Sequence, residues 1–497
     1  MSSDNGPKAY GNWTIPRSTG IGGATVGTTL VGLALIVISL LAGMFVTWWA
    51  GAVTVAVSVI IMIPLLRARA GRSGYEAMLL RRQFKRAQRK GENVFRSGPF
   101  SRVPGGRYRL PGPLGGTKIS EWETAGGQKF AMIHFPRQNQ YTVILRAFAQ
   151  GGEGVDQDRI DSMVWHWGAT LSSFGQDGDV AGAEAVIENL PATGIPLNQE
   201  VRTLVKGEAP PLAQDIMVES AEQLGTQRVA MDLRLALSFT ATTNERRKSA
   251  QEQSYEVSRR LMAMTPQLGL AGIRVRPMRI DEVVEFVHRA YTPSAQANLE
   301  FGRRAEGSHG VEWEDAGPAS AVAHRRRYEH DGATSSVWEM QTPPRGAVTE
   351  QVLRNLVAPN GGSARKRVNI VYRPHSAETA AQLVEQDYKN AHAAVDTGRA
   401  PALTKAQAKL RLSATEQARQ EEARGHGLTR FGMLMTVTED AENGDLPRAE
   451  GLLRALSVQS RLKVRRADYY QDLGFAAGLG VGVLLPDHAS VPKLMGA

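Results

Sequence analysis

One uncharged stretch constrains this chain more than any other feature of its sequence. No Asp, Glu, Lys or Arg occurs between Arg17 and Arg67, a run of 49 residues. A helix with a rise of 1.5 Å per residue crosses a hydrocarbon core of roughly 30 Å with about 20 residues. The run therefore has room for two membrane-spanning helices joined by a very short turn. Because the Trp48-Trp49 pair divides the run and indole rings favour membrane interfaces, we expect helices over Gly23–Phe45 and Trp48–Leu66.

Basic residues flank this run on both sides. Cytoplasmic flanks of membrane helices are rich in Lys and Arg, so both ends of the hairpin are expected in the cytoplasm, as in a two-pass protein of the inner (cytoplasmic) membrane. A polybasic segment beside a bilayer gains roughly 1 kcal/mol per Lys or Arg from anionic lipid. Apolar residues interleave with the basic ones at near-helical spacing, which is typical of an amphipathic helix on a membrane surface. The predicted membrane-surface basic segment comprises Arg67, Arg69, Arg72, Arg81, Arg82, Lys85, Arg86, Arg89 and Lys90, with anionic lipid as its partner.

The net charge of the chain is concentrated in the same region. Residues 1–90 hold eleven basic and two acidic residues, which accounts for nearly all of the formal charge of +10. The membrane explains this cluster, and the near-neutral remainder argues against sequence-specific binding of nucleic acid, which is the alternative for the cluster. A cleaved signal peptide is the alternative for the apolar run, but the run is far too long and follows a polar lead. Cysteine is absent, which excludes disulfides, thiol catalysis and Cys-ligated zinc.

The rest of the chain alternates strand-like and helix-like segments. This order predicts an α+β protein whose cytoplasmic part forms ferredoxin-like α/β layers. Two long helices over residues 377–424 are predicted to form a helical hairpin inserted into those layers. One helix is expected over Asn244–Thr265, and the polar segment Pro293–Gly317 is expected to be a linker or an exposed loop. The predicted parts are a cytoplasmic tail (1–20), a transmembrane helical hairpin (21–66), a basic juxtamembrane segment and linker (67–116), a first α+β domain (117–292) and a second α+β region (318–497).

Motifs that anchor enzymatic functions are missing. A phosphate-binding loop needs Gly-x4-Gly-Lys-Ser/Thr, and the chain contains no Gly-Lys pair. The zinc-hydrolase string His-Glu-x-x-His and the nucleophile string Gly-x-Ser-x-Gly are also absent. Three weaker clusters occur. We interpret His324–Asp331 as a charged loop or edge strand, His309 with its acidic neighbours as an acidic loop, and Gly478, Gly480 and Gly482 as tight packing. We therefore expect no enzyme activity, no catalytic residue, no cofactor and no metal.

The two ends of the sequence resemble known secretion proteins. Tyr10-Gly11-Asn12-Trp13 and Pro16-Arg17-Ser18, followed by a hairpin and a basic segment, resemble the small two-helix inner-membrane subunit (PrgI type) of conjugative type IV secretion systems. Phe431–Thr438, Leu452-Leu453, Tyr469–Leu473, Phe475 and Leu485-Pro486 are similar to the end of the amino-terminal, non-motor domain of the conjugation ATPase. The whole chain resembles a family of actinobacterial integral membrane proteins found with conjugative elements, on the landmarks Tyr328, Asp331-Gly332, Trp338, Pro343-Pro344-Arg345-Gly346, Arg367-Val368 and Tyr372-Arg373-Pro374.

The resemblance implies a scaffold and not a motor. It implies a non-enzymatic inner-membrane subunit of a conjugative type IV secretion machine that docks a separate cytoplasmic ATPase, joins other membrane secretion subunits and is oligomeric within that complex. The runner-up is an EccE-like membrane core subunit of type VII secretion, and the other classes considered are a membrane-tethered enzyme and a DNA-binding adaptor. The helical hairpin Ala377–Arg424 is one candidate surface for the ATPase. The favoured candidate dock comprises Tyr469, Tyr470, Phe475, Leu484 and Leu485.

Overall fold

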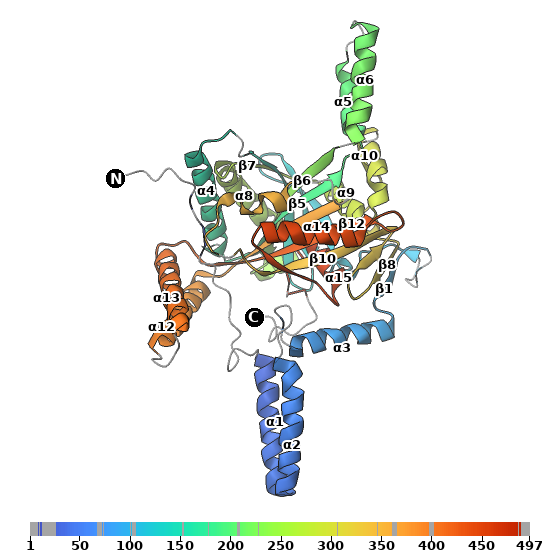
Figure 1. Ribbon diagram of the computed structural model, residues 1–497. Coiled ribbons are helices and arrows are strands. Elements are labelled where there is room, and N and C mark those ends of the chain that lie inside the picture. Colours follow the sequence, from blue (N-terminus) through green and yellow to red (C-terminus); the bar gives the residue numbers. More distant parts are fainter. Residues whose placement is uncertain are drawn as a thin grey trace, which may run out of the picture.

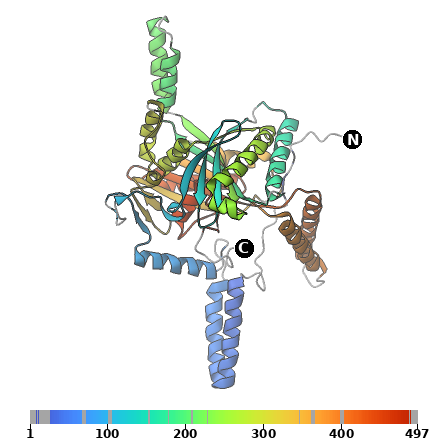
Figure 2. The same cartoon turned by 180° about the vertical axis from the view of Figure 1, so that it is seen from behind.

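A computed structural model gives the architecture of the chain (Figure 1). It describes residues 8, 10–11, 26–66, 72, 74–99, 101, 106–151, 154–176, 178–205, 209–226, 228–305, 307–344, 346–359, 365–396, 402–485 and 487–488. Two apolar helices, α1 and α2, pack side by side and extend away from a mixed helix and sheet body, and α3 lies crosswise to them where they meet it (Figures 1 and 2). The predicted α+β class is confirmed at this level. The helices are α1 (Val26–Phe45), α2 (Trp48–Leu66), α3 (Gly74–Lys90), α4 (Gln157–Gln176), α5 (Ile195–Leu204), α6 (Pro211–Thr226), α7 (Asn244–Lys248), α8 (Ala250–Leu270), α9 (Ile280–Tyr291), α10 (Gln296–Ala305), α11 (Arg354–Val357), α12 (Ala377–Asp396), α13 (Ala402–Ala423), α14 (Leu446–Gln459) and α15 (Gln471–Gly478).

One antiparallel sheet runs through the whole body. Its order is β1-β8-β9-β10-β12-β11-β5-β6-β4-β3-β2, with β13 paired to β10 and β7 paired to β4. The central pair, β5 with β11, joins strands that are far apart in the sequence, and Glu188 lies opposite Arg367 there. The strands are β1 (Val94–Arg96), β2 (Lys118–Glu123), β3 (Lys129–Phe135), β4 (Gln140–Ala149), β5 (Val180–Pro191), β6 (Val229–Thr240), β7 (Ile273–Pro277), β8 (Ser320–Ala323), β9 (Tyr328–His330), β10 (Ala333–Thr342), β11 (Arg365–Pro374), β12 (Thr429–Asp440) and β13 (Lys463–Arg466).

The sheet contains the same strand arrangement twice. In the first unit the spatial order is β7-β4-β6-β5, and in the second it is β13-β10-β12-β11, with every neighbouring pair antiparallel. Each unit has two helices between its second and third strands, α5 and α6 in one and α12 and α13 in the other. Each also has a long helix before its fourth strand, α8 or α14. The two units therefore meet at the pairing of β5 with β11.

Three apolar clusters hold helices against the two faces of this sheet. On one face, α9 and α15 contribute Phe286, Tyr291 and Phe475 to a cluster that extends across both units. In the second cluster α8 and α4 pack on the first unit, and α4 also contacts β11 and β12 of the second unit. In the third cluster α14 and α11 pack on the second unit. On the first of these faces, the last described residues together with α9 cover both units.

Several element predictions agree with the structure and two are wrong. Helix α2 has the predicted bounds. The single helix expected over Asn244–Thr265 is two helices, because the Ser249 side chain accepts a hydrogen bond from the backbone N–H of Glu252 and caps a new helix, α8. The expected linker Pro293–Gly317 contains α10, whose Gln296 and Leu299 are buried, so this segment packs on the body.

Candidate functional site

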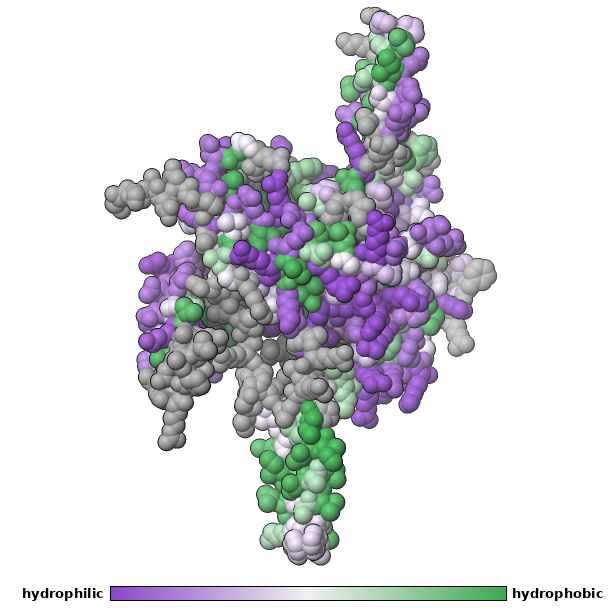
Figure 3. Space-filling view, viewed as in Figure 1, coloured by the Kyte–Doolittle hydropathy of each residue, from purple (hydrophilic) through white to green (hydrophobic). Residues whose placement is uncertain are grey.

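The apolar hairpin has a surface suited to lipid and an interior of small residues. Leu40 and Ile60 are each 67% exposed, and hydrophobic residues cover the hairpin in Figure 3. A Cβ on Gly51 would lie 2.8 Å from the Cα of Gly43, so the two helices approach closely there. Among the described residues, one helix is long and apolar enough to cross a membrane, over Thr28–Phe45, and Trp48–Ile63 is a shorter apolar helix.

Helix α3 carries most of the predicted basic segment, and it has an inner face against the body and an outer face directed away from it. Its Phe84 is half-buried, and the Phe84 ring meets the Tyr469 ring edge-on at 5.7 Å between centroids. The other face points away from the body, and α3 lies crosswise to the hairpin, as expected for a helix on a bilayer surface (Figure 1). The basic side chains on this exposed face are Arg81, Arg82, Lys85, Arg86, Arg89 and Lys90. Arg67 and Arg69 lie outside the described residues.

Arg72 does not belong to that exposed face. Its guanidinium donates a 2.6 Å hydrogen bond to Glu339 of β10 and also contacts the hydroxyl of Tyr470. The Tyr470 hydroxyl in turn donates to Glu339 at 2.6 Å, and Arg465 of β13 pairs with the same carboxylate. The membrane-surface prediction for Arg72 is therefore corrected: its side chain, 16% exposed, ties the chain after α2 to the body.

The segment that precedes the hairpin is also attached to the body. Tyr10 and Val348 exchange two backbone hydrogen bonds of 2.7 and 2.8 Å, which form a short β-bridge. Lys8 lies 3.4 Å from the carboxylate of Asp161 on α4, beside a shallow hollow of about 420 Å³ that also borders Trp165. The residues before α1 and those after α2 thus contact one and the same body.

The predicted partner dock at the end of the chain is largely internal. Phe475 and Leu484 are fully buried, so their side chains have no surface to offer a partner, and this part of the prediction is corrected. Tyr469, Tyr470 and Leu485 are half-buried. The physical reason is that α15 and the residues after it form the apolar cover over both units of the sheet.

Glycines and polar anchors hold this last segment against the sheet. Gly482 has φ +93°, and a Cβ there would lie 2.0 Å from the Thr142 hydroxyl, so no other residue fits. Its N–H donates to Glu184 at 2.7 Å, and its carbonyl accepts from Gln140 at 2.7 Å. Asn369 of β11 donates to Glu184 and to the carbonyl of Ala477, at 2.9 Å each. The tight packing predicted for the late glycines is confirmed, and it connects β4, β5 and β11.

Glu184 has no cationic partner among the residues that contact it in the described chain. Its side chain is fully buried, and burial raises its pKa to about 7, even though Asn369 and the Gly482 N–H donate to it. A carboxyl group of this kind changes protonation near neutral pH. The sequence contained a signal for it, because Glu184 and Glu188 interrupt a mostly apolar strand at positions that face the same side.

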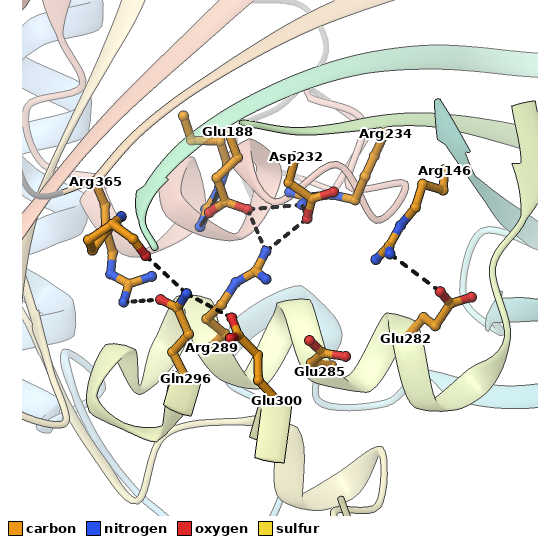
Figure 4. A network of polar contacts seen from close by, with 12 residues as sticks. Arg146, Glu188, Asp232, Arg234, Glu282, Glu285, Arg289, Gln296, Glu300 and Arg365 are labelled. Carbon is orange, nitrogen blue, oxygen red and sulfur yellow. Dashed lines mark hydrogen bonds and ion pairs between the residues drawn. The ribbon is translucent and has the colours of Figure 1, made fainter. Parts of the chain in front are cut away.

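A second buried cluster lies at the junction of the two units (Figure 4). The carboxylate of Glu188 accepts hydrogen bonds from Arg234 at 2.9 Å, from Arg289 of α9 at 3.2 Å and from Arg367 of β11 at 2.8 Å. Asp232 accepts from Arg234 and Arg289 at 2.7 and 2.9 Å. Three guanidinium groups therefore share two carboxylates in a nearly dry interior.

The electrostatics of this cluster indicate a structural role. Burial by itself would raise the pKa of Glu188, but Arg367, Arg234 and Arg289 outweigh it and hold that pKa well below its usual value. The same competition, with Arg234 and Arg289 as the main cations, lowers the pKa of Asp232 to about 2. Both carboxylates stay ionised at physiological pH. They fix β5, β6, β11 and α9 in one arrangement.

The remaining sequence clusters also have structural explanations. Of the two alternatives for His324–Asp331, the charged loop holds for His324–Arg327, which connect β8 to β9. His330 lies on β9, which pairs with both β8 and β10 and is therefore not an edge strand. Its ring contacts the carbonyl of Tyr291 and the Ser335 hydroxyl, and burial lowers its pKa to about 4, so it is neutral. In the described residues no group of three His, Asp or Glu side chains is placed to hold a metal.

Comparison with known families adds one match. The family described as "Domain of unknown function (DUF8461)" matches residues 17–76. No curated protein matches the chain. The matched residues run from Arg17 through both apolar helices to the start of α3, so this chain is similar to that family in its hairpin segment.

Proposed function

We propose that this protein is a non-enzymatic inner-membrane scaffold of a conjugative type IV secretion machine that holds a separate cytoplasmic ATPase at the membrane. The observation that carries the proposal is the attachment of both flanks of the hairpin to one body. The Tyr10–Val348 bridge lies before α1, and the Arg72–Glu339 ion pair lies after α2. A body bound by both flanks sits on one side of the membrane, so these contacts support a two-pass hairpin with both termini in the cytoplasm.

The proposed fold of the body is a pair of ferredoxin-like layers with an inserted helical hairpin. Each unit of the sheet has the strand order expected for a ferredoxin-like βαββαβ layer, in which the fourth strand lies beside the first. On this view, α12 and α13 are a helical hairpin inserted into the second layer, and α5 and α6 occupy the equivalent place in the first. The repeated order supports the resemblance at the level of fold, because ferredoxin-like layers carry many unrelated functions.

The helical hairpin Ala377–Arg424 is the better of the two candidate docks for the ATPase. It extends from the side of the body (Figure 1) and exposes Leu383 by 40% and Leu410 by 71%. A stable complex buries on the order of 800 Å² per partner. Two packed helices of about 30 Å length offer a surface of that size, since each residue adds 1.5 Å.

Topology is tested first, and the absence of native cysteine makes the test clean. Single variants Lys8→Cys, Thr47→Cys and Glu92→Cys are exposed to a membrane-impermeant maleimide in intact cells. We expect labelling of Thr47→Cys, in the turn between α1 and α2, and none at the other two positions until the cells are opened. Labelling of Lys8→Cys or Glu92→Cys in intact cells contradicts the hairpin.

Docking is tested by co-purification of the full chain with a secretion ATPase from the same cells. We expect the intact protein to retain the ATPase in mild detergent. The Leu383→Glu/Leu410→Glu variant should retain at least tenfold less ATPase. Leu204→Glu on α5, 68% exposed, is the matched control. Equal retention by all three proteins moves the dock elsewhere, and failure of the intact chain to hold any ATPase refutes the scaffold function.

A further inference from the structure

The turn between β8 and β9 lies directly beside the membrane-surface helix α3. The Tyr469 ring connects them: Phe84 of α3 meets it edge-on at 5.7 Å, and the Arg325 guanidinium lies 4.9 Å from its centroid. The backbone N–H of Tyr469 also donates to the Arg325 carbonyl at 2.8 Å. These contacts hold the turn, His324–Arg327, close to α3, although 240 positions separate Phe84 from His324.

Three consecutive arginines occupy this turn. Arg325 and Arg327 are about half-exposed and form partial ion pairs with Asp468 and Glu329. Arg326 is exposed and has no ion pair within the described residues. The turn adds positive charge close to α3, which has six exposed basic side chains of its own.

We propose that the β8–β9 turn and the outer face of α3 together form a binding surface for the phosphates of anionic phospholipid headgroups. The proposal rests on the proposed membrane location of the hairpin. Arginine binds phosphate through a planar pair of N–H donors, and phosphate is the anionic group common to these headgroups. Because α3 lies crosswise to α1 and α2 where they meet the body, its outer face is at the level where those headgroups begin (Figure 1), and the Tyr469 ring connects the turn to α3.

Charge and position together favour lipid over other anions. A basic residue close to an anionic bilayer strengthens the association roughly fivefold. The surface is continuous with the apolar hairpin, whereas a soluble acidic partner would have to approach it across the bilayer face. The turn is thus a second contact with the membrane, and it fixes the tilt of the body with respect to the hairpin.

The experiment uses the full chain in nanodiscs with spin labels at single cysteines. The positions are Arg326→Cys in the turn, Arg86→Cys on α3 and Met217→Cys on α6, which points away from the hairpin in Figure 1. Nickel-chelating headgroups at low density relax a nearby nitroxide. We expect the nickel-induced relaxation of the nitroxide at position 326 to be within twofold of that at position 86. The relaxation at both positions should be at least threefold greater than at position 217. Replacing one third of the phosphatidylcholine by phosphatidylglycerol should raise the value at 326 at least twofold, and this gain should disappear at about 0.5 M salt because of screening.

Each outcome distinguishes the two proposals. Relaxation at 86 with none at 326 overturns the lipid contact of the turn and leaves the membrane location intact. No relaxation at either position refutes the membrane location itself. Proximity at 326 that does not respond to phosphatidylglycerol overturns the binding of anionic headgroups. As a control for charge, Arg326→Glu should reduce the phosphatidylglycerol response measured at position 86 by at least half. Arg304→Glu on α10 should leave that response unchanged.

Discussion

The buried carboxyl of Glu184 makes the stability of the body depend on pH in a defined direction. Its pKa rises from 4.5 to about 7 on folding, so the folded state holds its proton more tightly than the unfolded state. The contribution of Glu184 to the free energy of unfolding is therefore fully present below pH 4.5. It falls as the pH rises toward 7 and does not change further above that pH. A shift of about 2.5 units corresponds to about 3 kcal/mol. The variant Glu184→Gln cannot titrate, and its amide oxygen can still accept from Gly482.

Thermal unfolding of the detergent-solubilised protein, followed by tryptophan fluorescence between pH 5 and pH 8, measures this effect. For a body of this size, 3 kcal/mol corresponds to a change in Tm of about 3–6 °C. We expect Tm of the unmodified protein to fall relative to that of Glu184→Gln by this amount over the pH range. Glu123→Gln, on the exposed edge strand β2, is the control and should follow the unmodified protein. A difference between the unmodified protein and Glu184→Gln that stays constant from pH 5 to pH 8 would show that Glu184 does not titrate there.

Two further substitutions test the cover and the junction. Glu188→Gln leaves three buried guanidinium groups with Asp232 as their main carboxylate, so we expect a loss of about 3–5 kcal/mol across the neutral range, seen as a fall in Tm or as failure to accumulate folded protein. Gly482→Ala forces a Cβ into Thr142 at φ +93°, and we expect a loss of about 2–4 kcal/mol with faster proteolysis after α15. Gly451→Ala in α14, where a Cβ meets nothing within 4 Å, should be neutral or slightly stabilising. An unchanged Tm for either of the first two variants contradicts the corresponding packing argument.

Local sequence patterns identified the elements that depend on neighbouring residues. The uncharged run and its tryptophan pair gave the two apolar helices, because hydropathy over about 20 residues is a local quantity. The two long helices predicted over residues 377–424, α12 and α13, followed from their own periodicity. The same patterns missed α10 and merged α7 with α8, since one capping serine decides that break.

Tertiary structure alone decided which residues became internal. The aromatic and apolar residues near the end of the chain suggested a docking surface for a partner. In the structure α15 packs over both units of the sheet, and Phe475 and Leu484 are buried. Arg72 likewise belongs to a uniformly basic stretch in the sequence, and only the approach of β10 gives it Glu339 as a partner. The sequence determined where this protein is apolar, basic and periodic, because those properties are set by neighbours along the chain. The pairing of β5 with β11, which brings Glu188 and Arg367 together from 179 positions apart, depends on long-range packing that no local pattern contains.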